Sequence, residues 1–513
     1  MVDRSLARNA LCVVAGLVAA LVLDAPPVRA DGNLQNVNHI IVVMQENHSF
    51  DNYFGVLAYV PGTPYHSATG KGKKRACPAT DHTCVDGLSC RVVQGTLTCT
   101  NSNKSNDPGR VKAFHELNYC PGPDLDHGWD ATHREANFRA PNKTLKSTRN
   151  NGYVRINAER EAPEQAIAHD TMGYYTDADL PWYYSLAETF AINDRYFSSV
   201  LGPTFPNRAY LGAATSFGHL TTQEITSLEV LNQGGYKPIT GTIFSLLDQS
   251  NVSWTDYYAD LPYSVIFSPL SAHQKPLSTF AADAAAGTLP AVSFIDPSAF
   301  ADQVINGITV QTDEHPPNDI RAGQYFVWTI VDAVRNSPSW NDSIVIITYD
   351  EHGGFYDHVA PPAAPQGAAA TPDGIAPGQC ADLSNPPAST QPGGGVNCTV
   401  SSTDSAPALC PDFTPTGPYP SKCATFNQLG IRLPFTVVSP FAKPHYVSHT
   451  VGDHTSILAL IEKRFLNGAY MTARDQHADT LEDMFDFDTA PSANATIAAA
   501  PLPAVTDPGC PFP

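Results

Sequence analysis

Basic residues are scarce in this chain. Its 513 residues include 30 Lys and Arg against 50 Asp and Glu, which gives a formal net charge of −20. Proteins that bind nucleic acid contact its phosphate groups with stripes of basic side chains, and the sequence contains no such stripe. The charge balance therefore argues against nucleic acid as a partner.

Long apolar runs are scarce as well, and after the amino terminus no segment is long and apolar enough to span a bilayer. The apolar segment 10–23 is shorter than the about 20 residues that a membrane span needs. It follows Arg4 and Arg8 and precedes the small-x-small sequence of residues 28–30, which is typical of a cleaved signal peptide. We expect residues 1–30 to be this signal, rather than a membrane anchor, and the protein to be exported to the periplasm or the medium.

Compact zinc-binding patterns are missing among the cysteines. Apart from Cys12 in the expected signal, the chain has ten cysteines, of which four lie within 77–99 and four within 380–423. Their spacings do not match those of zinc sites, and an even number in an exported protein is typical of disulfides. We expect most bridges to form within these two segments, while the spacing leaves the pairing open.

The chain shows no internal repeat, and its composition favours one main domain over residues 31–487. Two stretches rich in Pro, Gly, Ser or Cys, at about 61–110 and 363–424, are predicted to be insertions at the surface. Residues 488–513 form an Ala- and Pro-rich tail.

Short apolar runs alternate with helical patterns. The runs are 39–44, 291–295, 343–348 and 433–438, and apolar residues recur with helical spacing in 179–190, 323–335 and 455–465. Such runs are typical of buried parallel strands, and the alternation predicts an α/β sandwich. Polar residues follow each run, and parallel sheets bind ligands beyond the carboxyl ends of their strands.

Oxygen ligands follow two of these strands. Glu46 and Asn47 come after the first run, and Asp350 and Glu351, with two glycines behind them, come after the run 343–348. Such ligands favour a hard divalent cation, Ca, Mg or Mn. Taken alone, the first pair is better explained as a polar loop in which Asn47 caps a helix. For the pair after the second strand, a functional role is favoured over a solvated loop.

Thr204 is the candidate nucleophile. Its hydroxyl lies in Gly202-Pro203-Thr204-Phe205-Pro206-Asn207, where Gly and Pro restrict the backbone. A metal beside the hydroxyl would stabilise its alkoxide, and Asn207 is placed to donate to a phosphoryl oxygen. On spacing alone the simpler role is favoured, in which Thr204 caps a helix over residues 206–211.

Histidines beside acids or prolines complete the candidate site: His127, His315, His352 and His454. A protonated imidazole can bind phosphate oxygens or protonate a leaving alkoxide. Asp453 resembles the cap of the last predicted helix, and that role is compatible with substrate binding by His454 and Asp453.

Together these segments resemble the phosphoesterase family of bacterial and plant non-specific phospholipases C and a related acid phosphatase. The resemblance is carried by IVVMQENHSFDNYFG, DLDHGW, GPTFPNR, SFIDP, EHPPNDI, YDEHGGFYDHV and the stretch 434–465. It implies an alkaline-phosphatase-like three-layer sandwich with a mainly parallel sheet. It also implies one divalent metal held by Glu46, Asn47, Thr204, Asp350 and Glu351, a phosphate contact from Asn207, and a pocket lined by His127 and His315.

Within that family, Thr204 resembles the threonine of the phospholipase C members, whereas the acid phosphatase branch has serine there. The resemblance thus implies a secreted phospholipase C that cleaves the glycerol-side phosphodiester of phospholipids, with transient contact to a membrane surface. An acid phosphatase acting on phosphomonoesters is the alternative, and a non-catalytic protein that binds a phosphorylated ligand is a more distant one.

Overall fold

The computed structural model describes residues 34–488 and 497, except 71–75, 107–108, 141–147, 161–167, 221, 223–234, 268–270, 306, 366–370 and 376–425. The expected signal, nearly all of the tail and most of the second predicted insertion lie outside these residues. Among the helices described, none is long and apolar enough to cross a membrane.

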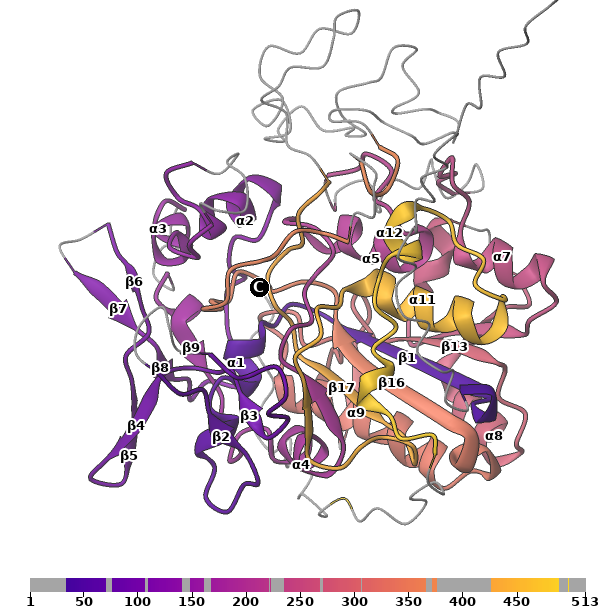
Figure 1. Ribbon diagram of the computed structural model, residues 1–513, viewed down its shortest axis with the longest axis horizontal. Helices are drawn as coiled ribbons and strands as arrows, with labels where there is room; N and C mark the ends of the chain where they lie inside the picture. Colours follow the sequence, from indigo (N-terminus) through magenta and orange to yellow (C-terminus); the bar gives the residue numbers. More distant parts are fainter. Residues whose placement is uncertain are drawn as a thin grey trace, which may run out of the picture.

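An eight-stranded sheet forms the centre of the fold (Figure 1), in the order β12-β11-β13-β1-β16-β17-β10-β18. Its strands are β12 (Gln274–Pro276), β11 (Trp254–Tyr258), β13 (Val292–Asp296), β1 (His39–Gln45), β16 (Ser343–Tyr349), β17 (Phe435–Val438), β10 (Ala191–Asn193) and β18 (Tyr446–Ser448). Neighbouring strands are parallel except at β17, which runs antiparallel to both β16 and β10. The predicted α/β class and the mainly parallel sheet are confirmed.

The central strands of the sheet are unbroken apolar runs because both of their faces are buried. β1 lies between β13 and β16, and residues 40–44 and 344–347 are buried on both faces. A strand covered on both sides needs no polar alternation, and the β-branched Ile and Val that fill these positions pack well on a pleated surface.

Two groups of helices accompany the sheet. In the first, α4 (Pro181–Thr189) and α8 (Phe280–Ala285) contact α9 (Ile320–Arg335). In the second, α5 (Thr204–Ala213) contacts α7 (Ile243–Gln249) and α11 (His454–Phe465), and α11 also contacts α12 (Ala473–Gln476). In Figure 1 the first group lies below the labelled strands β1 and β16 and the second above them. The three predicted helices correspond to α4, α9 and α11.

The direction of β17 differs from what the sequence suggested. We expected the run 433–438 to be one more parallel strand with its polar end at the site. In the antiparallel ladder Thr348 lies opposite Phe435, and Ser439 donates its hydroxyl to the carbonyl of Ser343 at 2.8 Å, at the start of β16. Ser439 therefore lies at the edge away from the candidate site, because a short apolar run carries no information about strand direction.

The first predicted insertion forms small two-stranded sheets on one side of the molecule (Figure 1). Its strands are β2 (His66–Ser67), β3 (Cys84–Val85), β4 (Cys90–Val93), β5 (Thr96–Cys99), β6 (Ser102–Lys104) and β7 (Arg110–Lys112). Disulfides join Cys77 to Cys84 and Cys90 to Cys99. Both bridges are local, as expected for this segment.

The remaining elements near the candidate site are short. They are α1 (Phe50–Phe54), β8 (Phe114–His115), α2 (Trp129–Ala136), α3 (Tyr153–Ala158), β9 (Gly173–Tyr174), β14 (Gln303–Ile305) and β15 (Ile308–Val310). β8 pairs with β9, and β14 with β15.

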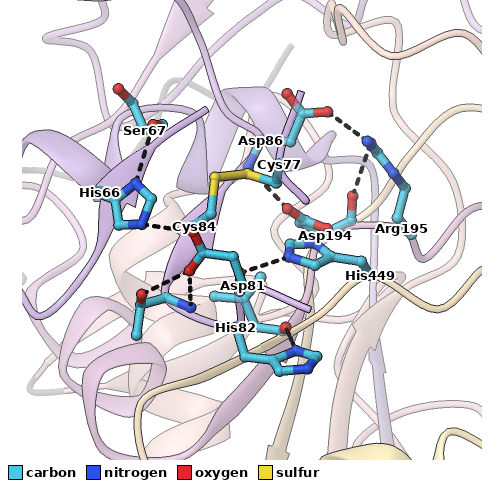
Figure 2. Close-up of a disulfide and its surroundings, with 12 residues drawn as sticks. His66, Ser67, Cys77, Asp81, His82, Cys84, Asp86, Asp194, Arg195 and His449 are labelled. Carbon is cyan, nitrogen blue, oxygen red and sulfur yellow. Dashed lines mark hydrogen bonds and ion pairs between the residues drawn. A yellow bond between two sulfur atoms is a disulfide. The ribbon is translucent and has the colours of Figure 1, made fainter. Parts of the chain in front are cut away.

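Charged side chains hold the insertion against the central sheet (Figure 2). Asp194, directly after β10, contacts His449 Nδ1 at 2.7 Å and accepts the backbone N–H of Asp86 at 2.9 Å. His449 Nε2 donates to the carbonyl of Asp81 at 3.0 Å, and Arg195 pairs with Asp86 at 2.7 Å. The disulfide between Cys77 and Cys84 lies beside this network.

Arg432 is the most deeply buried cation of this interface. Its guanidinium contacts Asp51 at 2.9 Å and Asp357 at 3.0 Å, and it also donates to the carbonyls of Asp86 and Asp194. Burial lowers the pKa of Arg432, but the surrounding carboxylates raise it above its usual range. Arg432 thus joins α1, the loop after β16 and the insertion.

Replacing Arg432 by Leu should lower the free energy of unfolding by about 3–5 kcal/mol, because it leaves Asp51 and Asp357 as buried charges without their partner. Urea denaturation measures the change. The matched control is Arg91→Leu on β4, an exposed arginine, which should change stability by less than about 0.5 kcal/mol. Equal stability of the two variants would show that Arg432 does not hold this interface.

Candidate active site

The two predicted pairs of metal ligands lie side by side. β1 and β16 are parallel neighbours with Gln45 opposite Tyr349, so the residues that follow them leave the same edge of the sheet. Asp350 Oδ1 accepts the backbone N–H of Asn47 at 3.2 Å and that of Glu351 at 2.7 Å. The sheet register therefore brings Glu46, Asn47, Asp350 and Glu351 together.

Asn47 has an unusual backbone conformation, with φ of 65°, which is uncommon for a residue other than glycine. It does not cap α1, since that role belongs to Ser49, which accepts the N–H of Asn52. Gly353 packs against Asn47 so closely that a Cβ there would lie 2.4 Å from the Asn47 carbonyl oxygen. This close approach accounts for one of the two glycines after Glu351.

Several buried oxygens of this cluster have no hydrogen-bond donor within the described part of the chain. They are Asn47 Oδ1, Asp350 Oδ2 and Glu351 Oε1, and Asn47 Nδ2 is also without a partner. Buried polar atoms are nearly always paired, so such a group calls for an explanation. Carboxylate and amide oxygens are the ligands that hard divalent cations prefer.

The electrostatics of the cluster agree with this donor set. Burial raises the pKa of Glu46 well above its usual range, and the nearby Asp350 carboxylate raises it further. Burial also raises the pKa of Glu351, although His127 opposes the rise. Carboxylates crowded in this way repel one another when they are charged, and a bound cation would reverse that repulsion. The residues present therefore fit one divalent metal.

Arg208 was not assigned a role from the sequence. It lies on α5, and its Nε and Nη2 contact Glu46 Oε1 at 3.0 and 2.8 Å. Its Nη1 lies 3.5 Å from Asp296 Oδ1, at the end of β13. The signal was its position four residues after Thr204, which places both side chains on one face of the helix.

Thr204 is the first residue of α5, and Pro203 occupies the cap position. The capping alternative for Thr204 is therefore wrong. Its hydroxyl is half-buried and donates to Glu46 Oε2 at 3.3 Å, so the predicted nucleophile lies next to one of the predicted metal ligands.

The amide of Asn207 holds the loop before α5. Its Oδ1 accepts the N–H of Val200 at 3.0 Å, and its Nδ2 donates to the carbonyls of Gly202 and Pro203 at 2.8 and 3.1 Å. Both of its polar atoms are thus engaged with the backbone that presents Thr204. A direct phosphate contact by Asn207 stays a prediction.

His127 and His315 form one wall of the cluster, with ring centroids 5.8 Å apart. His127 Nε2 lies 3.7 Å from Glu351 Oε1, and the ligand atoms of His127, His315 and Asp124 lie within 4.8 Å of one another. Burial lowers the pKa of His127, but Asp124 and Glu351 outweigh it and raise the pKa to about 10. Burial likewise lowers the pKa of His315, and Asp124 and Asp313 raise it above its ordinary value. Both rings are suited to bind an anion or to donate a proton.

His352 and His454 brace the cluster from behind. Buried His352 contacts Glu135 Oε2 through Nε2 at 2.8 Å. His454 Nε2 donates to the carbonyl of Asp350 at 2.7 Å, and its Nδ1 lies 3.0 Å from the Tyr196 hydroxyl. Burial lowers the pKa of His454. The contacts described for these two rings are with protein groups, and their predicted catalytic roles stay predictions.

Asp453 occupies the cap position of α11, as the sequence suggested, and pairs with Arg474 at 3.0 Å. Its carboxylate is buried. Substrate binding by Asp453 also stays a prediction.

Glu314 is a second residue that the sequence did not single out. Its buried carboxylate accepts the hydroxyls of Tyr53, Tyr183 and Tyr349 at 2.6, 2.5 and 2.7 Å, and the Gln45 amide at 3.1 Å. It has φ of 71° and lies between Asp313 and His315. Glu314 therefore anchors the loop of His315 to the ends of β1 and β16. Its place at the start of the EHPPNDI motif was the available signal, but its role could not be read there because its partners come from four separate segments.

Comparison with known proteins agrees with this geometry. Residues 37–466 match the model of the Phosphoesterase family. The chain belongs to the phosphoesterase family. The resemblance drawn from the motifs is thus confirmed.

Named relatives are phospholipases C. Non-specific phospholipase C6 of Arabidopsis thaliana is 32% identical over 63% of this chain and 55% of its own length. Non-specific phospholipase C1 of the same plant is 28% identical over 89% of this chain and 72% of the relative. Phospholipase C B of Mycobacterium tuberculosis is 28% identical over 90% of this chain and 80% of the relative. The match with the C6 relative therefore spans little more than half of that protein.

A metal test follows from the unpaired oxygens. Protein dialysed against a chelator should bind one equivalent of Ca, Mg or Mn and gain thermal stability from it. Asp350→Asn should reduce the affinity at least about tenfold, since it removes the charge that bridges both ligand pairs. Calorimetric titration measures this, with Asp488→Asn at the exposed end of the described domain as control. Equal metal affinity of wild type and Asp350→Asn would contradict the assignment.

Glu314 generates a pH-dependent prediction. Burial raises its pKa to about 7, against the lowering effect of its tyrosine hydrogen bonds, so the folded state keeps a proton that the unfolded chain releases near pH 4.5. Its contribution to the free energy of unfolding must therefore fall as pH rises from 4.5 to 7. Glu314→Gln cannot titrate, so its urea-unfolding stability should fall less than that of wild type between pH 5 and pH 7. Parallel pH profiles of the two proteins would contradict the raised pKa.

Proposed function

We propose that the protein is an exported phospholipase C that cleaves the glycerol-side phosphodiester of a phospholipid to diacylglycerol and a phosphorylated headgroup. The observation that carries the proposal is the position of the Thr204 hydroxyl, which donates to Glu46 Oε2 at 3.3 Å, one of the acidic residues gathered where β1 and β16 end. Family membership and relatives named phospholipase C support it. The two local disulfides are compatible with export.

The metal ligands of this proposal are Glu46, Asn47, Asp350 and Glu351, with the hydroxyl of Thr204. Buried oxygens that lack a hydrogen-bond donor support one divalent cation at these ligands. Oxygen ligands indicate a hard cation such as Ca, Mg or Mn, without selecting one of the three. Bound there, the metal would lower the basicity of the Thr204 oxygen and neutralise charge on the phosphoryl group. For the fold, we propose an alkaline-phosphatase-like sandwich, in line with the family resemblance.

The reaction uses the side chains in two steps. The Thr204 hydroxyl passes its proton to Glu46 Oε2, which accepts its hydrogen bond, and its oxygen attacks phosphorus to form a phosphothreonine. The bond to the glycerol oxygen breaks as a protonated His127 or His315 gives that oxygen its proton. In the second step water gives a proton to the now neutral imidazole and attacks the phosphothreonine. The phosphorylated headgroup is released, and Glu46 returns its proton to the Thr204 oxygen. Arg208 and Glu314 hold Glu46 and the His315 loop in place during both steps.

The test replaces Thr204 by Val, which keeps the shape of the side chain but removes its hydroxyl. Turnover of phosphatidylcholine and of p-nitrophenyl phosphorylcholine should fall at least about a thousandfold, with an unchanged circular dichroism spectrum. Thr204→Ser should retain measurable turnover, because it keeps an oxygen nucleophile. Near-normal turnover by the Val variant would exclude Thr204 as the nucleophile.

Assay of p-nitrophenyl phosphate beside these substrates separates the alternatives. Turnover of the monoester alone would favour an acid phosphatase. Metal and phosphate binding without turnover of any ester would favour a binding protein.

A further inference from the structure

A segment with two exposed apolar side chains lies beside the candidate active site. It comprises residues 298–305 and 307–312, called the lip below, and includes β14 and β15. Phe300 and Val304 are 66% and 72% exposed. Single exposed apolar residues are common, but two large ones on one short segment, of which Phe300 lines a pocket, are more informative.

Both ends of the lip are part of the candidate site. It begins two residues after Asp296, which contacts Arg208, and its last residue, Thr312, lies three residues before His315. Its base is closed by Ser298 and Thr312, whose backbone N–H groups each donate to the hydroxyl of the other, at 3.0 and 3.1 Å. The lip is thus fixed to the residues around Thr204.

Asp260 fixes the turn that carries Phe300. Its Oδ2 accepts the backbone N–H groups of Ala299, Phe300 and Ala301 at 2.8, 2.6 and 2.9 Å. Three charge-assisted hydrogen bonds to one oxygen hold a turn firmly. Phe300 is therefore presented to solvent by an ordered backbone, although burying it would be favourable.

A small pocket connects the lip to Thr204. Its lining includes Glu46, Thr204 and Arg208 together with the apolar residues Leu261, Pro262, Pro297 and Phe300. Its volume is about 70 Å³, room for only a few water molecules. A phospholipid could place no more than a small part of itself inside, and the rest would lie outside against Phe300.

We propose that the lip is the surface by which this protein contacts phospholipid aggregates, with Phe300 and Val304 entering the headgroup region. The inference rests on the proposed function, and it names the face that meets the lipid. The scissile phosphodiester of a bilayer lipid lies at the membrane surface, so the mouth of the pocket must approach that surface. The net charge of −20 offers no attraction to anionic lipid, so apolar contact carries the binding.

The first experiment measures co-sedimentation with phosphatidylcholine vesicles. Val304→Asp and the milder Val304→Ser should each reduce the vesicle-bound protein, the Asp variant by about tenfold in partition coefficient. Val92→Asp is the matched control, because Val92 on β4 is 63% exposed and lies in the insertion instead of the lip. Binding of wild type should persist as NaCl is raised. Unchanged binding by both Val304 variants, or an equal loss in Val92→Asp, would overturn the proposal.

A second measurement reports on position directly. A tryptophan introduced as Val304→Trp should add fluorescence that shifts to shorter wavelength when phosphatidylcholine vesicles are added, since the indole enters an apolar environment. Val92→Trp should show no such shift. Equal shifts, or no shift at position 304, would overturn the assignment of the lip.

Comparing turnover of a soluble substrate with turnover of vesicles tests the lip separately from the proposed function. Val304→Asp should hydrolyse soluble p-nitrophenyl phosphorylcholine like wild type and phosphatidylcholine vesicles about tenfold more slowly, in proportion to its lost binding. Equal loss on both substrates would overturn the lip as a lipid-contact surface. A wild-type protein that hydrolyses neither substrate would overturn the proposed function, and the two binding measurements would then decide on the lip alone.

Discussion

The parallel pairing of β1 with β16 is the constraint on which the candidate site depends. These strands are neighbours in the middle of the sheet and end level with each other, so Glu46-Asn47 and Asp350-Glu351 emerge at one point although about 300 residues separate them. Asp350 then joins the two pairs by accepting N–H groups from both Asn47 and Glu351. A shift of one residue in this register would turn the side chains at the strand ends to opposite faces.

Buried charge is the consequence of that pairing. Burial raises the pKa of Glu46 and Glu351, and the neighbouring Asp350 carboxylate raises both further. Arg208 and His315 beside Glu46, and His127 beside Glu351, partly offset this rise. The same principle recurs behind the site, where Glu314 is surrounded by hydroxyl donors, and at the insertion, where Arg432 lies between two aspartates. In each case a buried charge ties together segments that are far apart in the sequence.

The sequence was sufficient for the central strands, the main helices and the clustering of acids at strand ends, because apolar periodicity and strand-end position are local signals. The sequence did not predict the direction of β17, since a short apolar run is equally compatible with a parallel and an antiparallel strand. It also left Asn47 and Thr204 open as helix caps, which the positions of Ser49 and Pro203 exclude. Arg208 and Glu314 escaped notice because their importance comes from partners in distant segments, and only the family resemblance had set Thr204 apart.

The reversed direction of β17 has a consequence for how this fold can vary. Because Thr348 of β16 lies opposite Phe435 of β17, the connection over residues 350–434 leaves and re-enters the sheet at one edge, the edge that carries the site. A connection between antiparallel neighbours needs no crossover helix. The middle of this connection can therefore change in length without changing the pairing of β16 with β17, as long as Asp350 and Glu351 at its start and Arg432 near its end are kept.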